Sequence, residues 1–225
     1  MNARLRLALP FASLVLAGLQ LPGQAIAARG VIAVPKSSVR LGDVTERVDG
    51  VWAGAALAFD AGRFLFTASG TRGTLTASGT GAVPKRDVGE ISLSGRYAVR
   101  PWLSLDFGYV TRAFSSAAGY QRWDIVSVGA SGSRDLGTPA VRAVAALALL
   151  PVAKIGGQPD PSVALRSDVG LSVAPRGSPL AFTLGYRVER FHFSQSAVRS
   201  EQFETLTLSI GVRAQRVDGR WRLGG

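Results

Sequence analysis

Hydrophobic and polar residues alternate along most of the chain from Val51 onward. The segment FETLTLSIGVRAQR (203–216) shows the pattern most clearly, with leucine, isoleucine and valine on one face and threonine, serine and arginine on the other. A two-residue period is typical of a β-strand whose two faces meet different surroundings. The same period predicts strands at 51–59, 63–69, 90–99, 102–114, 124–131, 140–150, 163–173, 181–189 and 203–216.

The connections between these strands alternate between short and long. Short turns are predicted at 60–62, 100–101, 135–139 and 175–179, and long polar links at 71–87, 115–121, 153–162 and 194–204. This rhythm is typical of outer-membrane barrels, which have short periplasmic turns and longer extracellular loops.

If the short turn at 60–62 lies in the periplasm, strand 51–59 runs toward the periplasm. An ascending strand must then precede it, and Ser37–Val44 is the candidate. The predicted fold is therefore all-β: a single antiparallel up-and-down transmembrane β-barrel of ten strands, spanning about 37–216, with both ends in the periplasm. An eight-stranded barrel is the alternative, if one weak hairpin is misassigned. The departure from the usual pattern is at the end, where the last strand leads into VDGRWRLGG and Trp221 is the only late aromatic residue.

The N-terminus has the three parts of a secretory signal peptide. Arg4 and Arg6 precede the apolar run LALPFASLVLAGL, and Ala25 and Ala27 supply the small residues that signal peptidase requires. We predict a signal peptide at 1–27, cleaved after Ala27 or Ala28, and a barrel domain at 28–225. A retained membrane anchor is the alternative. A signal peptide followed by a transmembrane β-barrel predicts a location in the bacterial outer membrane.

Aromatic residues gather near both ends of the predicted strands, as expected for rings at the two membrane interfaces. One band is Phe59, Phe64, Tyr97 and Trp102, and the other is Phe114, Tyr120, Trp123, Phe191 and Phe193. A soluble sandwich or lipocalin-like barrel, with these rings in its core, is the alternative. It would need a well-charged outer face, whereas the polar face here is mostly serine, threonine, glycine and isolated arginine.

Composition excludes several other classes of protein. The chain has no cysteine and one histidine, so we expect no disulfide, no metal site and no cofactor. The longest apolar run in the body, 143–152, is half the ~20 residues that a spanning helix needs. The formal charge is +11, and the signal peptide carries two of those charges. The arginines are spaced singly along strands, which together with export argues against nucleic-acid binding.

The chain resembles the small outer-membrane β-barrel superfamily, the OmpA/OmpX/OmpW-like proteins. The resemblance covers roughly 37–216 and rests on the signal, the alternating strands, the strand–turn–strand RYAVRPWLSLDFGY and the closing LTLSIGVRA. It implies a barrel, outer-membrane lipid and lipopolysaccharide as partners, and assembly by the barrel-assembly machinery. It implies no particular activity, and the oligomeric state stays open.

Charged residues fall on the polar, inward face of the predicted strands. Small barrels fill their interior with side chains, and charges buried there need partners. We expect a charge network made of Arg96, Asp106, Arg112, Arg142, Arg166, Asp168, Arg187, Glu189 and Arg213. The expected role is non-enzymatic: structural support, surface contact or limited permeation. A narrow, porin-like channel that prefers anions is the alternative, because the arginines outnumber the acids.

One segment, RFHFSQS (190–196), raises the question of catalysis. His192 and Ser194 share a strand face, and Glu201 and Glu204 follow across the predicted loop. Serine, histidine and carboxylate are the elements of acyl hydrolysis. The arrangement resembles that of barrel lipid A deacylases, although Gln195 stands where those enzymes have asparagine. An interfacial histidine is the simpler interpretation, and a lipid A deacylase-like hydrolase is the alternative.

Lipopolysaccharide phosphates are the expected partners of arginines near the extracellular rim. Arg112, Arg122, Arg190 and Arg199 are the candidates.

Overall fold

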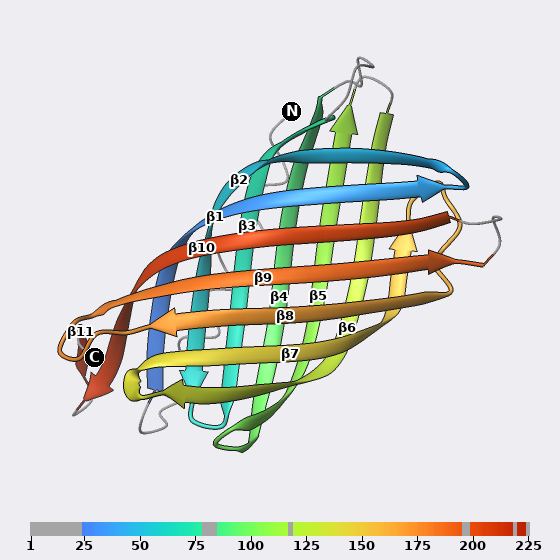
Figure 1. Cartoon of the computed structure of the whole chain (residues 1–225). Coiled ribbons are helices and arrows are strands. Elements are labelled where there is room, and N and C mark those ends of the chain that lie inside the picture. Colours follow the sequence, from blue (N-terminus) through green and yellow to red (C-terminus); the bar gives the residue numbers. More distant parts are fainter. Residues whose placement is uncertain (1–23, 78–84, 117–118, 195–198, 218–219, 224–225) are drawn as a thin grey trace.

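The computed structural model describes residues 24–77, 85–116, 119–194, 199–217 and 220–223, all as strands and their connections (Figure 1). The strands are β1 (Gln24–Leu41), β2 (Val44–Ala61), β3 (Phe64–Ala77), β4 (Arg86–Arg100), β5 (Leu103–Ser116), β6 (Gly119–Leu136), β7 (Thr138–Ile155), β8 (Val163–Val173), β9 (Leu180–Phe193), β10 (Arg199–Val217) and β11 (Arg220–Leu223). Within these ranges no helix is long and apolar enough to cross a membrane.

Ten of the described strands close into an up-and-down barrel. Each strand pairs antiparallel with the next, and β1 pairs with β10 along nearly its whole length. The predicted fold class and the ten-strand count are confirmed, and the eight-strand alternative is wrong. The tail forms β11, which folds back onto the last residues of β10, so that Leu223 pairs with Ala214.

The four predicted short turns lie at one end of the barrel, which we call the turn end; the opposite end, which also has the two-residue turn between β1 and β2, is the loop end. Gly62 and Gly137 make two of these turns with φ of 76° and 71°, a left-handed conformation that glycine adopts without strain. The start of β1 and the end of β10 lie at the turn end too, since Ala25 pairs with both Asp60 and Gln215. Both ends of the barrel domain are therefore on the side predicted to be periplasmic.

The first strand differs from the prediction. It begins at Gln24 rather than Ser37 and ends at Leu41, and the next strand begins at Val44. The inward positions of its first half are mostly small or apolar, for example Ala27, Val31 and Ala33, so the polar half of the alternation is missing from the sequence. Most of the predicted signal peptide, 1–23, lies outside the described residues, and its cleavage stays a prediction.

The strands also extend further into the predicted links at the loop end. The link predicted at 71–87 is strand up to Ala77 and again from Arg86, and β10 begins at Arg199. The strands on both sides of the 78–85 connection therefore extend further toward the loop end than predicted.

The outer wall carries a broad apolar belt. Exposed hydrophobic residues occupy successive outward positions on every barrel strand, including Ile32, Val34, Leu57, Phe66, Ile91, Leu105, Val128, Leu147, Leu165, Leu184, Leu208 and Ile210. On β1 the belt extends from residue 26 to residue 34. At a rise of ~3.3 Å per residue and a tilt of about 40°, this is about 20–25 Å, the height of the apolar band in outer-membrane barrels.

The second predicted aromatic band is mostly wrong. Tyr120 is exposed on the outer face, but Trp123, Phe191 and Phe193 are buried, and Phe114 packs against them. These four rings point into the barrel. At the turn end, by contrast, Phe64 and Trp102 are exposed on the outer face, as predicted.

Glycines let β2 and β3 approach each other closely inside the barrel. A Cβ atom on Gly54 would lie 2.0 Å from the carbonyl oxygen of Gly70, whereas a Cβ atom on Gly70 would meet nothing within 4 Å. We expect Gly54→Ala to lower the free energy of unfolding by about 1–3 kcal/mol, because the backbone must move, and Gly70→Ala to change it by less than about 0.5 kcal/mol. Urea unfolding of the refolded barrel measures both. Equal urea midpoints for the two variants would refute the steric explanation.

Candidate functional site: the barrel interior and its loop end

An arginine bound by two glutamates lies at the centre of the interior. Arg112 on β5 donates from Nε to Glu90 on β4 (2.7 Å) and from Nη2 to Glu189 on β9 (2.9 Å). The side chains of Arg112 and Glu189 are 2% and 0% exposed. Three strands separate β5 from β9 along the wall, and Figure 1 shows the two on different sides of the barrel. The Arg112–Glu189 pair therefore crosses the interior.

A second group of charges adjoins this pair. Asp168 on β8 accepts a hydrogen bond from Nε of Arg187 (2.7 Å) and lies 3.0 Å from Nε of Arg166. Arg166 is opposite Glu189 in the β8–β9 register. The central layer thus contains three arginines, Arg112, Arg166 and Arg187, and three carboxylates, Glu90, Asp168 and Glu189. Its formal charge is balanced.

The remaining predicted interior charges lie nearer the turn end, as separate pairs. Arg96 bonds to Asp106 at 2.6 Å, Arg142 to Asp135 at 2.8 Å and Arg213 to Asp60 at 3.5 Å. The last two pairs are about half exposed. The structure therefore divides the predicted network into a buried central group and pairs that lead to the opening at the turn end.

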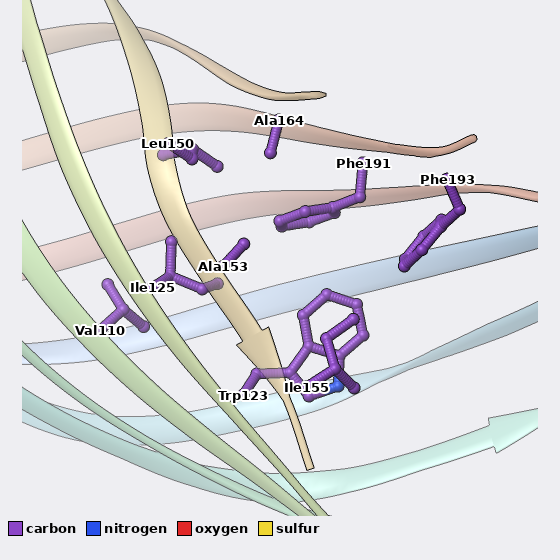
Figure 2. Close-up of a cluster of buried hydrophobic side chains, with 9 residues drawn as sticks. All are labelled: Val110, Trp123, Ile125, Leu150, Ala153, Ile155, Ala164, Phe191 and Phe193. Atoms are coloured by element: carbon purple, nitrogen blue, oxygen red, sulfur yellow. The ribbon is translucent and has the colours of Figure 1, made fainter. Parts of the chain in front are cut away.

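Aromatic side chains fill the interior on the loop side of Arg112. Trp123 from β6 meets Phe191 from β9 edge to face, with ring centroids 5.0 Å apart, and Figure 2 shows the two rings with Phe193 beside them. On the other side Trp52 packs against Phe203, with centroids 5.5 Å apart. Phe114 contacts both clusters. Side chains from opposite walls thus meet at this level.

A cavity of about 250 Å³ lies above this aromatic layer, at the mouth of the barrel. Its walls include Phe114, Trp123, Phe191 and Phe203, and Arg112 lines its inner end. Two ion pairs lie on its rim, Glu46 with Arg86 (3.1 Å) and Glu201 with Arg199. The mouth of the barrel therefore holds a cavity with aromatic walls and a charged rim.

These rim pairs were missed by sequence reasoning. Strand parity could have indicated part of them. If the alternation is extended beyond the predicted strand ends, Glu46 and Glu201 fall on the inward face. The partners themselves could not be inferred, because Arg86 and Glu46 lie 40 residues apart and on different strand pairs.

The suspected catalytic residues lie on different faces of the wall. His192 is exposed on the outer face of β9, and Ser194 is exposed just after that strand ends. Glu201 points inward, where it is buried and bound by Arg199. Glu204 points outward, but its carboxylate already accepts hydrogen bonds from a tyrosine and a glutamine. The structure thus assembles no hydrogen-bonded serine, histidine and carboxylate from these four residues.

Two of the four arginines expected to meet lipid phosphates also point inward. Arg112 is buried at the centre and Arg199 binds Glu201 inside the mouth. Arg122 faces outward, but it is paired with Asp124 at 2.9 Å. Arg190 is exposed on the outer face. No group of three histidine, cysteine, aspartate or glutamate side chains in the described ranges could hold a metal ion.

No protein-family model and no curated protein sequence matches the chain. Among solved structures the chain is similar to the outer membrane protease OmpT of Escherichia coli, with a TM-score of 0.50 and 10% identity over 88% of this chain and 98% of that one. It also matches neisserial surface protein A (TM-score 0.40, 14% identity, 84% of this chain and 97% of that one) and Ail of Yersinia pestis (0.33, 12%, 86% and 99%).

The match to OmpT, at this identity, shows the fold alone. The chain has the fold of the small bacterial outer-membrane β-barrels, as the sequence resemblance predicted.

Proposed function

We propose that this protein is a non-enzymatic β-barrel of a bacterial outer membrane, with a sealed interior and a role exerted through its surface. The observation that carries the proposal is the Arg112–Glu189 pair, which crosses the interior with almost no solvent exposure. The aromatic layer above it and the balanced charges around it support the same role. The apolar belt supports the membrane location, because only closed barrels and helices satisfy their backbone groups in hydrocarbon.

Conductance in planar bilayers tests this proposal. We expect the refolded protein to give no discrete current steps in 1 M KCl, because the buried Arg112–Glu189 pair crosses the interior and would obstruct ion passage. A porin reconstituted in the same way is the positive control, and heat-modifiable migration in gels verifies that the barrel is folded. Anion-selective steps from the wild-type protein would instead favour the narrow channel.

The mass of lipid A in cells that express the protein distinguishes the acyl-hydrolase alternative from the proposed role. Expression in cells should leave the mass of lipid A unchanged, with wild-type protein and with His192→Ala alike. The loss of an acyl chain that depends on His192 would favour the enzyme over the proposed role.

A further inference from the structure

The outer wall has a groove at its loop end, outside the barrel interior. Its volume is about 420 Å³ and it extends across the loop ends of β1, β8, β9 and β10. The residues that matter for its chemistry are Arg40, Arg190, His192, Ser200, Val163 and Leu165.

The groove lies where the apolar belt meets the polar rim. On β8 the outward residues Val163 and Leu165 remain apolar up to the loop end, and they pair with His192 and Arg190 of β9. In the same register, Ser200 of β10 lies between His192 and Arg40 of β1. One wall of the groove is therefore apolar, and the other carries cationic and hydroxyl groups.

Both arginines of the groove retain donors that no protein group uses. Nε of Arg40 donates to the carbonyl oxygen of Gly42 (3.0 Å), and Nε of Arg190 donates to Gln202 (2.9 Å). These bonds fix the orientation of the two guanidinium groups. Among the described residues their Nη groups have no hydrogen-bond partner, and neither arginine has a salt-bridge partner. The free edges of two exposed guanidinium groups therefore border one groove.

The carboxylates nearby are committed elsewhere. Glu201 points into the barrel and binds Arg199. Glu204 is one register row nearer the apolar belt, where its carboxylate binds Tyr186 and lies opposite Lys36 in the β1–β10 pairing. Glu204 attracts Arg190 through space, but no carboxylate of the described residues forms an ion pair with Arg40 or Arg190, so both guanidinium groups can still bind an anion.

We propose that this groove binds the phosphorylated headgroup of an outer-leaflet lipid, with the phosphate between Arg40 and Arg190 and an acyl chain along Val163 and Leu165. Arginine suits this role because its planar fork bonds two phosphate oxygens at once. The inference rests on the proposed membrane location and adds a specific lipid site to it.

Lipid A carrying two phosphates, in detergent micelles, is the probe. Native mass spectrometry of the full, folded chain measures its binding. We expect Arg40→Gln with Arg190→Gln to weaken binding about a hundredfold, roughly tenfold for each charged hydrogen-bond donor. Arg72→Gln with Lys154→Gln is the matched control: it removes the same charge from outward positions outside the groove and should leave binding unchanged.

Further probes separate the sources of the phosphate. Lipid A without phosphates should bind the wild-type protein as weakly as lipid A binds the groove variant, and millimolar inorganic phosphate should not displace lipid A. Displacement by inorganic phosphate would mean a site for the free ion and overturn the lipid assignment. Equal binding by the wild type and the groove variant, or equal losses in the groove and control variants, would also overturn it.

These outcomes are independent of the conductance test. Failure of lipid binding in a silent barrel leaves the sealed-barrel role intact. If the wild-type protein conducts ions and its lipid binding depends on Arg40 and Arg190, the sealed-barrel role is refuted and the lipid site is retained.

Discussion

Replacing Arg112 by methionine is expected to lower the free energy of unfolding by about 3–5 kcal/mol. The substitution leaves Glu90 and Glu189 inside the barrel without the guanidinium that binds both, and Glu189 is fully buried. Removing one partner of a buried ion pair costs much more than the pair contributes, because the remaining charge stays desolvated. Urea unfolding of the refolded protein, followed by tryptophan fluorescence and gel mobility, measures the change.

A double variant provides the control for this prediction. Arg112→Met with Glu189→Gln removes one charge of each sign, so the central layer stays balanced with Arg166 and Arg187 against Glu90 and Asp168. We expect it to recover at least half of the stability that the single variant loses. Equal losses in both would mean that the size and packing of Arg112, including its position over the Phe203 ring, matter more than charge.

An arginine placed at the middle of the apolar belt should have the second large effect. Leu147 is 72% exposed on the outer face of β7, halfway along the belt. In lipid vesicles we expect Leu147→Arg to lower the free energy of unfolding by about 2–4 kcal/mol, because the charge must enter the bilayer midplane.

Val152→Arg is the depth control on the same strand. Val152 is the last apolar outward residue before Lys154, so an arginine there reaches the interface and should cost about 0–1 kcal/mol. Urea titration in vesicles compares the two variants. If Leu147→Arg is no less stable than Val152→Arg, the belt does not face hydrocarbon, because a position exposed to water would accept either arginine.

The sequence predicts the architecture well because lipid and interior differ so strongly in polarity. Leu208 and Ile210 alternate with Thr207 and Ser209, and the structure places the first two outward. The pattern fails where both faces are apolar, as in the first half of β1. Along that segment residues such as Ala27 and Val31 face inward, so nothing in the local sequence separates the two faces.

The inward aromatic layer was predictable in part. Phe191 and Phe193 lie two and four residues after Glu189 and therefore on the same, inward face of β9. Their aromatic character suggests a position at the membrane interface, but strand parity predicts correctly that they face inward. The contact between Arg112 and Glu189 was beyond sequence reasoning, because alternation gives the face of a residue but not which strand lies across the barrel. That choice depends on strand tilt and stagger, which the closed barrel fixes as a whole.

The pairing of β1 with β10 has a consequence for the timing of folding. The first strand of the barrel has its final partner only when the last strand is present, since Arg29 pairs with Gly211 and Leu41 with Arg199. An unpaired strand edge is not tolerated in hydrocarbon. The chain is therefore expected to stay out of the membrane, unfolded and in need of protection, until its C-terminal end has been synthesised and exported.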